Sequence, residues 1–202
     1  MADSIGLLGD APVRNSFRRD PVQSDGDVVV EMHILNPAIN YQAIARIYER
    51  MQGAICSFFY DRGPTSPMLF PQFLEVCDLN KGHAAFALVM KLEIIGFVLL
   101  SDLQGKHRAH ISMWLEPKVR GVNSHLIARY ALTELHSRYH IANIYALTPW
   151  RHSQELCLRA GMIEVAEIPG YCKWGDDDIH DLKVFHSDAA LWRLEVKGEE
   201  DG

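Results

Sequence analysis

Four basic residues lie around one short turn in the middle of the chain, where the sequence could bind an anion. Lys106 and Arg108 precede a strand-like segment, and Lys118 and Arg120 follow it, directly before Gly121. A helical pattern starts after the glycine, and the N–H groups and dipole at a helix N-terminus favour a phosphate or pyrophosphate. The cluster contrasts with the formal charge of −6 of the whole chain. The alternative is that these are solvated turn residues, as most lysines and arginines are.

The segments on either side of this turn must form a strand and an amphipathic helix. Ala109 to Leu115 alternates polar and apolar side chains, which predicts a strand with one buried face, and Pro117 ends it. Asn123 and Ser124 suit the start of the helix as capping residues. Apolar residues then recur at spacings of three and four, at Val122, Leu126, Ile127, Tyr130, Ala131 and Leu135.

A second strand and a short helix complete the unit. Ile144 to Leu147 is prone to form a strand, and Ser153 to Ala160 can make two helical turns that stop at Gly161. Two strands joined through a helix are normally parallel with a right-handed crossover. The turn before Gly121 should therefore lie at the carboxyl ends of the strands, where ligands of α/β sheets usually bind.

This order of elements resembles the GCN5-related N-acetyltransferase family, whose members bind acetyl-coenzyme A. The family's turn reads Arg/Gln-x-x-Gly-x-Gly/Ala, and here Lys118-Val119-Arg120-Gly121-Val122-Asn123 occupies it. Gly121 matches and Lys118 keeps a cation, whereas Asn123 replaces a small residue. A second family signature is Asn-x-x-Ala, a Leu-Tyr pair and Gly-Phe. This chain has Trp150 in place of the asparagine and Cys157 in place of the tyrosine.

The resemblance implies a fold, a cofactor and a site. The fold would be α/β (α+β), a mixed and largely antiparallel sheet flanked by helices, with a parallel strand-helix-strand unit at 109–147. The cofactor would be acetyl-coenzyme A, its pyrophosphate on the turn and the reaction's oxyanion on backbone N–H groups near Met113 to Leu115. The implied cofactor-binding residues are Met113, Trp114, Leu115, Lys118, Arg120, Gly121, Val122, Asn123 and Ser124.

Acetyl transfer also needs groups that move protons. A lysine-like amine, with a pKa of about 10.4, must lose a proton to attack, and a departing thiolate, with a pKa of about 8.5, must gain one. His110 is the first candidate for the base and Tyr145 the second. Cys157 occupies the family's general-acid position, although a buried cysteine acting as a small hydrophobe is the alternative.

The rest of the chain reads as support for this unit. Predicted strands and helices fall at 28–35, from Asn36-Pro37 to Met51, at 73–79, 83–90, 93–100, 163–168 and 179–185, with loops at 61–67 and at Pro169-Gly170 and 176–178. Residues 28–186 would form the acyltransferase domain. Residues 1–27 would be a flexible or partner-docking tail, in which Ile5, Leu7 and Leu8 could anchor a partner, and residues 187–202 a C-terminal tail.

Composition excludes several classes of protein. The chain has 202 residues, of which 48% are hydrophobic, so it can bury a core. A sequence pI near 5.9 without a basic tract argues against a dedicated nucleic-acid binder. No membrane-spanning run is visible, and four widely spaced cysteines suit a reducing cytoplasm. His136 and His140 have a metal-ligand spacing but lack the rest of a metal motif, so no metal is expected.

Two functions fit these observations. The first is an acetyl-coenzyme A dependent N-acyltransferase that acts on a small-molecule or protein amine. The second is a protein that keeps the fold without the reaction and serves in an assembly through residues 1–27, because Asn123, Trp150 and Cys157 depart from the family pattern. The sequence also has a weak resemblance to acetyltransferase-like proteins of bacteriophages, which would allow a virion component.

Overall fold

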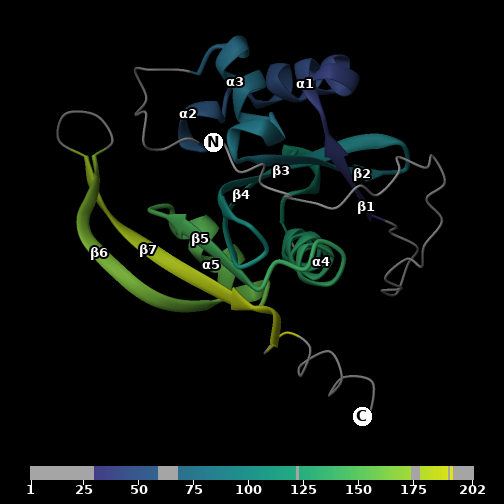
Figure 1. The fold of residues 1–202 in the computed structure, drawn as a ribbon. Coiled ribbons are helices and arrows are strands. Elements are labelled where there is room, and N and C mark those ends of the chain that lie inside the picture. Colours follow the sequence, from purple (N-terminus) through teal and green to yellow (C-terminus); the bar gives the residue numbers. More distant parts are fainter. Residues whose placement is uncertain (1–29, 59–67, 122, 174–177, 191, 193–202) are drawn as a thin grey trace, which may run out of the picture.

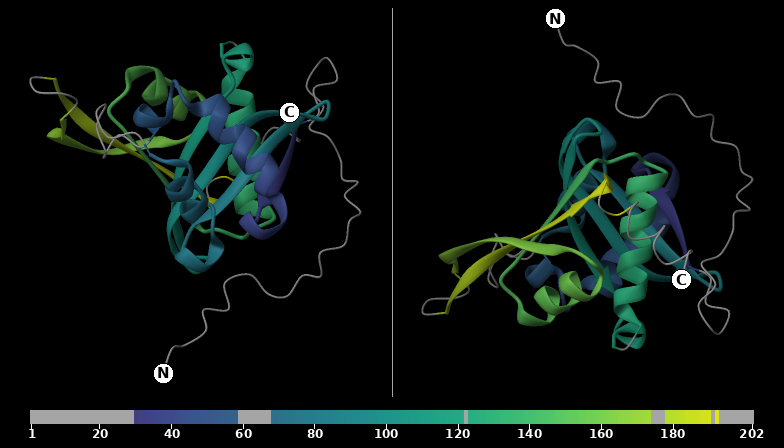
Figure 2. Two further views of the ribbon diagram at one scale, coloured as in Figure 1. Left: turned by 90° about the horizontal axis from the view of Figure 1, so that it is seen from above. Right: turned by 90° about the horizontal axis from the view of Figure 1, so that it is seen from below.

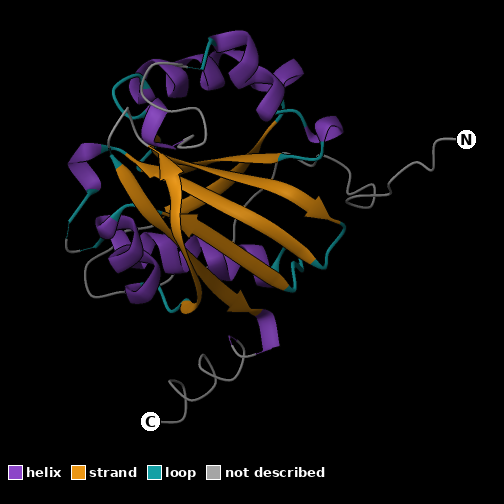
Figure 3. Cartoon of the chain, turned by 90° about the vertical axis from the view of Figure 1, so that its left-hand side faces the viewer, coloured by secondary structure: helices purple, strands orange, loops and turns teal. Residues whose placement is uncertain are grey.

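The fold is a seven-stranded mixed sheet with helices on both faces (Figures 1 and 3). The computed structural model describes residues 30–58, 68–121, 123–173, 178–190 and 192. The strand order is β1-β2-β3-β4-β5-β7-β6. The elements are β1 Val30–Leu35, α1 Pro37–Met51, α2 Ile55–Phe58, α3 Phe70–Val76, the 3-10 turn η2 Leu79–Lys81, β2 Ala84–Met90, β3 Glu93–Gln104, β4 Arg108–Leu115, the 3-10 turn η3 Pro117–Val119, α4 Ser124–Ser137, β5 Asn143–Thr148, α5 Arg151–Arg159, β6 Ile163–Lys173 and β7 Ile179–Asp188.

The parallel unit predicted around the basic turn is confirmed. β4 pairs with β5 in parallel, and α4 connects them, whereas every other neighbouring pair in the sheet is antiparallel. α4 starts at Ser124, directly after the turn with Gly121, and buries Ile127, Ala131 and Leu135. The turn and the start of α4 therefore lie at the carboxyl end of β4, as expected.

The core has two layers, one on each face of the sheet. Between the sheet and α4 and α5 lies a cluster that includes Leu88, Leu132 and Ile144. Between the sheet and α1 to α3 lies a second cluster, with Ile44 and Phe73 at its centre. Figure 2 shows these two helical layers from above and from below. β2 and β3 are buried on both faces, which explains their near-continuous apolar sequences.

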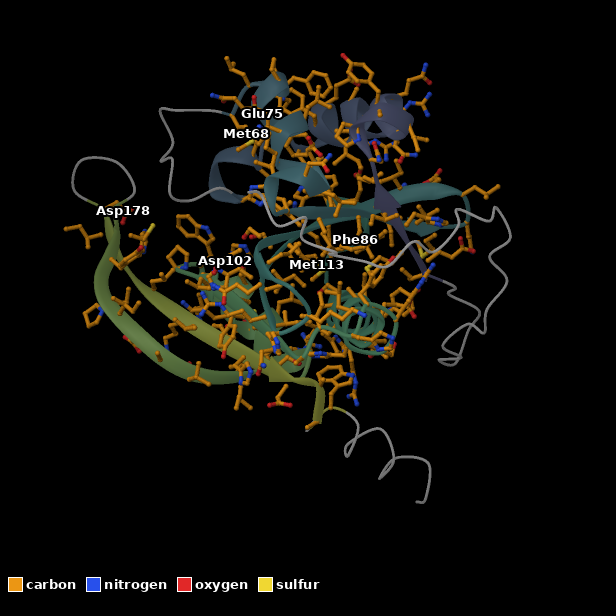
Figure 4. All side chains as sticks on the ribbon, in the orientation of Figure 1. Met68, Glu75, Phe86, Asp102, Met113 and Asp178 are labelled. Carbon is orange, nitrogen blue, oxygen red and sulfur yellow. The ribbon has the colours of Figure 1, made fainter. Side chains whose placement is uncertain are left out.

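The end of the chain departs from the predicted boundaries. Pro169 and Gly170, expected in a loop, lie inside β6, where the register with β7 shifts between Ile168 and Cys172. A bulge of this kind accommodates a proline, which has no N–H to pair. β6 and β7 form a long curved ribbon that extends to Asp178, far from Met113 near the centre of the molecule (Figure 4).

The domain also continues beyond residue 186, so the expected tail from 187 is wrong for its first residues. Ser187 is buried and hydrogen-bonded to His136 of α4, and Trp192 is only 6% exposed. A single buried tryptophan carries no periodic signal, so the sequence pattern did not include it in the domain. The loop at 61–67, the tail at 1–27 and the first two residues of the strand at 28–35 lie outside the described residues.

The hairpin between β2 and β3 contains a local conflict between sequence and backbone. Met90 pairs with Glu93, and both loop residues have positive φ angles, 51° for Lys91 and 65° for Leu92. Such loops favour Asn-Gly, because a left-handed conformation costs other residues about 1–2 kcal/mol. The Leu92 side chain, 98% exposed, gains nothing from packing in return.

We therefore expect Leu92→Gly to stabilise the protein. The free energy of unfolding should rise by about 1 kcal/mol, which corresponds to about 2–4 °C in Tm for a chain of this size. Thermal and urea unfolding would measure it. Leu92→Ala is the matched control, because it removes the exposed side chain but keeps the strained backbone. Equal stabilisation by both variants would contradict the backbone explanation.

Candidate functional site

The site lies where β4 and β5 part. Their pairing runs from Arg108 opposite Asn143 to His110 opposite Tyr145, and then ends, although both strands continue. A cavity of about 110 Å³ occupies the gap. Its lining comes from α2, β4, α4, β5, α5 and the residues beside α5: Phe58, Ile111, Ser112, Met113, Ala128, Leu132, Ala146, Leu147, Thr148, Trp150, Ser153, Leu156, Cys157, Ala160 and Met162.

This lining comes from both helical layers. Ala128 and Leu132 belong to α4 in one layer, whereas Phe58 of α2 packs with the core of the other. The cavity therefore lies in the plane of the sheet with helices on both sides of it. Most of its walls are apolar, and the polar side chains Ser112, Thr148 and Ser153 are the exceptions.

Backbone N–H groups of β4 point into this gap. The amide of Glu116 donates to the carbonyl of Ile95 at 2.8 Å, and this bond shows which residues of β4 hydrogen-bond to β3. Since alternate residues of an antiparallel pair bond to the partner strand, Trp114 bonds to β3, whereas Met113 and Leu115 direct their N–H groups away from it. The Leu115 carbonyl, on the same outward side, accepts from Nε of Arg120 at 2.8 Å.

The predicted oxyanion residues thus separate into two groups. Met113 and Leu115 direct their amides toward the gap, so they stay candidates for an oxyanion site. Trp114 does not, because its amide is paired with β3 and its side chain, 5% exposed, packs in the core beneath α1 to α3. Successive residues of a strand direct their amides to opposite sides. Once one residue of β4 is known to bond to β3, the sequence alone therefore separates Trp114 from Met113 and Leu115.

The turn before α4 has a backbone conformation that favours glycine, and it is open on the side where a side chain of residue 121 would lie. Gly121 has a φ of +117°, which L side chains rarely adopt, and a Cβ added there would meet no atom within 4 Å. The amide and the hydroxyl of Ser124 both donate to the Gly121 carbonyl, at 3.2 and 2.8 Å. Asn123 is the N-cap residue of α4, but its side chain makes no capping hydrogen bond. Val122 lies outside the described residues.

The four cations do not gather around this turn. Lys106 and Arg108 lie at the opposite end of β4, roughly 23 Å away for eight extended residues, and Arg108 pairs with Asp102 at 2.9 Å. Lys118 pairs with Glu93, and this hydrogen bond holds the pKa of the Glu93 carboxyl below its usual value. The four cations are close in sequence because they flank one strand. The length of that extended strand keeps the two pairs apart in space.

The two predicted bases lie side by side at the point where the strands part. His110 and Tyr145 are opposite each other in the last paired position, with ring centroids 6.2 Å apart. Tyr145 also stacks on His186 of β7, at 4.7 Å and an interplanar angle of 19°. His186 was missed because the predicted strand ended at residue 185. A longer strand in register with β5 would have brought it to this position.

Cys157 and Trp150, which stand where the resemblance expects a tyrosine and an asparagine, both line the cavity. Burial raises the pKa of the Cys157 thiol to about 12. A donor with that pKa gives up its proton to a departing thiolate only uphill, because an ordinary thiol has a pKa near 8.5. Trp150 is the N-cap of α5, and its amide donates to the hydroxyl of Thr148 at 3.1 Å. Cys157 is thus part of the largely apolar wall of the cavity.

Of the two histidines considered as metal ligands, His136 is buried in the core and His140 is exposed. His136 is 2% exposed, and its ring nitrogens contact the Ile141 carbonyl at 2.6 Å and the Ser187 hydroxyl at 2.8 Å. His140 lies beyond the end of α4 with a φ of 56°. Among the described residues no group of three or more histidine, cysteine or acidic side chains is arranged to hold a metal.

Comparisons with known proteins identify the fold. No protein-family model matches the sequence, and no curated protein matches it in sequence. Solved structures do match. Spermidine N-acetyltransferase from Vibrio cholerae, in complex with CoA and spermine, superposes with a TM-score of 0.64 at 13% identity, over 81% of this chain and 97% of that one. The chain has the fold of the GCN5-related N-acetyltransferases.

Two further acetyltransferase structures share this GCN5-related fold. Ribosomal-protein-S5-alanine acetyltransferase from Vibrio fischeri has a TM-score of 0.62 at 16% identity, over 81% of this chain and 94% of that one. An acetyltransferase from Salmonella typhimurium that modifies the N-terminal serine of ribosomal protein L7/L12 has a TM-score of 0.60 at 11% identity, over 79% and 94%. These matches give no support to the bacteriophage or virion resemblance. No helix in the described part of the chain is both long and apolar enough to cross a membrane.

Proposed function

We propose that the chain is an N-acyltransferase that moves an acyl group from coenzyme A to an amine. The observation that carries this proposal is the parting of β4 and β5 after His110 and Tyr145. It creates an apolar cavity with two outward amides of β4 on one side and α5 on the other. An acyl thioester and an amine need such a place, because the developing oxyanion requires N–H donors in a water-poor site.

The residues present fit the phosphate end of coenzyme A. The turn is open in front of Gly121, and α4, which is 14 residues long, begins directly after it with the positive end of its dipole at the turn. Arg120 is fixed beside the turn by its bond to Leu115, so its guanidinium can add a positive charge there. Gly121, Ser124, Asn123, Arg120, Lys118 and Val122 are the proposed pyrophosphate residues.

The bound coenzyme would supply a thioester carbonyl, and the chain would do the rest. The amides of Met113 and Leu115 would stabilise negative charge on the carbonyl oxygen. A side chain beside the parting of β4 and β5 would accept a proton from the amine, and the sequence offers His110 first and Tyr145 second as candidates for it. Cys157 would act as part of the apolar wall that excludes water, and not as a proton donor, because its pKa is raised. Acetyl is the proposed acyl group.

The acceptor is an amine, and the structural neighbours suggest which probes to try. Their names describe one enzyme that acts on spermidine and others that act on an alanine or an N-terminal serine of ribosomal proteins. Spermidine and short peptides with a free N-terminal serine or alanine therefore cover the small-molecule and protein alternatives. Release of the coenzyme A thiol from acetyl-coenzyme A would report turnover with either class.

Calorimetry with coenzyme A tests the proposal directly. We expect binding by the full chain, and at least about 10-fold weaker binding by Gly121→Val, because a β-branched residue strains the turn and covers its amides. Gly105→Val is the matched control: Gly105 also has a positive φ, +60°, and open surroundings, but it lies beyond the other end of β4. Equal losses in both variants would point to backbone strain alone, and no binding by the wild-type protein would refute the proposal.

The alternative is that the fold persists without the reaction. It is favoured by Cys157, whose raised pKa makes it a poor acid where the family often has a tyrosine, and by Lys118, whose charge is paired with Glu93. In that case residues 1–27, outside the described residues, would act in an assembly. Absence of coenzyme A binding, together with a change in assembly size when residues 1–27 are deleted, would select this alternative.

A further inference from the structure

Three aromatic side chains form a row across the sheet at the point where β4 and β5 part, and the residues that follow two of them, Ile111 and Ala146, line the cavity. His110, Tyr145 and His186 come from the adjacent strands β4, β5 and β7, at positions that are directly in register. Their strand neighbours Ala109, Ile144 and Phe185 belong to the core beneath α4 and α5. Because side chains alternate along a strand, the row lies on the other face, and each of its members is half-buried.

The last member of the row is held in one orientation by two contacts. The His186 ring stacks on Tyr145, and its Nε2 lies 2.9 Å from Oδ1 of Asn143. The amide of Asn143 is itself oriented, because Nδ2 donates to the carbonyl of His107 at 3.0 Å. A carbonyl oxygen only accepts, so Oδ1 must be the atom that faces His186. His186 therefore carries a hydrogen on Nε2 whenever the ring is neutral.

This arrangement leaves Nδ1 as the basic atom of the neutral ring. Within the described part of the chain, Nδ1 of His186 has no hydrogen-bond partner. A ring that takes up a proton there becomes a cation stacked on the face of Tyr145, which is an attractive arrangement. His110 differs, because no hydrogen bond from a described residue fixes its tautomer. His186 is thus the better prepared of the two histidines to accept a proton.

We propose that His186 is the proton acceptor for the incoming amine, with its tautomer set by Asn143 as a positioning residue. This rests on the proposed acyl transfer. Of the two protons that an ammonium group must lose, one passes to Nδ1 of His186, directly or through one water, and then to solvent. The second leaves the nitrogen once the C–N bond has formed, and it reaches the sulfur as the C–S bond breaks. The products are the amide, the free thiol and one released proton.

The tautomer can be tested without any turnover. The full chain, labelled with ¹⁵N in its ten histidines, would be studied by long-range ¹H–¹⁵N correlation, with His186→Gln to assign the signal. We expect the pattern of a ring protonated at Nε2 in the wild-type protein, and a mixture of tautomers in Asn143→Ala. A wild-type ring protonated at Nδ1 would overturn the proposal.

The catalytic role is tested by kinetics with acetyl-coenzyme A and the spermidine and peptide probes. His186→Gln should lower kcat by about 100-fold with an unchanged KM for acetyl-coenzyme A, and Asn143→Ala by about 10-fold. Added imidazole should restore part of the activity of His186→Ala. His33→Gln, an exposed histidine on β1 that contacts Glu31, is the control and should behave as wild type.

The outcomes separate this proposal from the one on which it rests. If the wild-type protein turns over a probe and His186→Gln does so at the same rate, His186 is not the proton acceptor, and the acyltransferase proposal stands. If the wild-type protein neither binds coenzyme A nor turns over any probe, acyl transfer itself fails. Thermal melting and coenzyme A calorimetry of each variant distinguish a lost proton acceptor, with affinity unchanged, from a damaged fold. If His186→Gln melts early, His186→Asn takes its place in the kinetics.

Discussion

Gly96→Ala is expected to lower the free energy of unfolding by about 3 kcal/mol. Gly96 lies in β3 opposite Leu115, and a Cβ at this position would stand 2.8 Å from Cδ2 of Leu115 and 2.8 Å from the carbonyl oxygen of Trp114. The leucine side chain could rotate, but the carbonyl belongs to the paired backbone of β4. The added methyl must therefore push the two central strands apart.

The same displacement should reach the functional site. Leu115 is the residue whose amide points into the gap between β4 and β5, and whose carbonyl holds Arg120. We expect Gly96→Ala to weaken coenzyme A binding as well as stability, although Gly96 does not line the cavity. Urea unfolding and calorimetry measure the two effects. Gly53→Ala is the control, because a Cβ there meets nothing within 4 Å. Wild-type stability of Gly96→Ala would contradict the close approach of β3 and β4.

Trp192→Ala should cost about 3–5 kcal/mol, the usual range for removing a buried large aromatic side chain. The indole N–H donates to the hydroxyl of Thr133 at 3.1 Å, and the ring lies 5.9 Å from that of His136 and below the guanidinium of Arg129. Its edge also approaches the position where a Cβ of Gly161 would stand, at 3.0 Å. The side chain thus ties the end of the chain to α4 and to the glycine after α5.

This prediction separates two views of the C-terminal segment. If residues from 187 on were a tail, Trp192→Ala would leave the thermal melt unchanged, as Leu158→Ala should, since Leu158 is 51% exposed. A large loss in Trp192→Ala alone would show that the domain includes Trp192. Trp192→Phe is a useful third variant, because it keeps most of the apolar contact and removes only the bond to Thr133.

The sequence predicted the architecture well where a short-range pattern decides it. The alternation from Ala109 to Leu115, and the three-and-four spacing after Gly121, report which faces are buried, and burial is what organises a sheet and its covering helix. The bulge at Pro169 could not be predicted in this way. A proline and a glycine also suit a loop, and only pairing with β7 makes them part of a strand.

The site was less predictable, because it depends on contacts between distant segments. Gly121 was singled out because it matches the turn of the family that the sequence resembles, and its φ of +117° favours a glycine. The partners of the cations were not found: Glu93 lies far from Lys118 in sequence, and the bond of Arg120 to Leu115 depends on how the turn closes. His186 and Asn143 are 43 residues apart, and only the register of β5 and β7 brings them together.

The short pairing between β4 and β5 also determines which backbone amides have no partner strand. Three paired positions join a four-stranded half, β1 to β4, to a three-stranded half, β5 to β7. Beyond them the amides of Met113 and Leu115 have no neighbouring strand to protect them, although Leu115 is buried and Met113 is half-buried. In hydrogen exchange they should behave like surface amides, faster than Trp114 between them, and should slow when a ligand fills the gap. Slower exchange of the Met113 and Leu115 amides, relative to that of Trp114, would therefore indicate that a ligand occupies the gap.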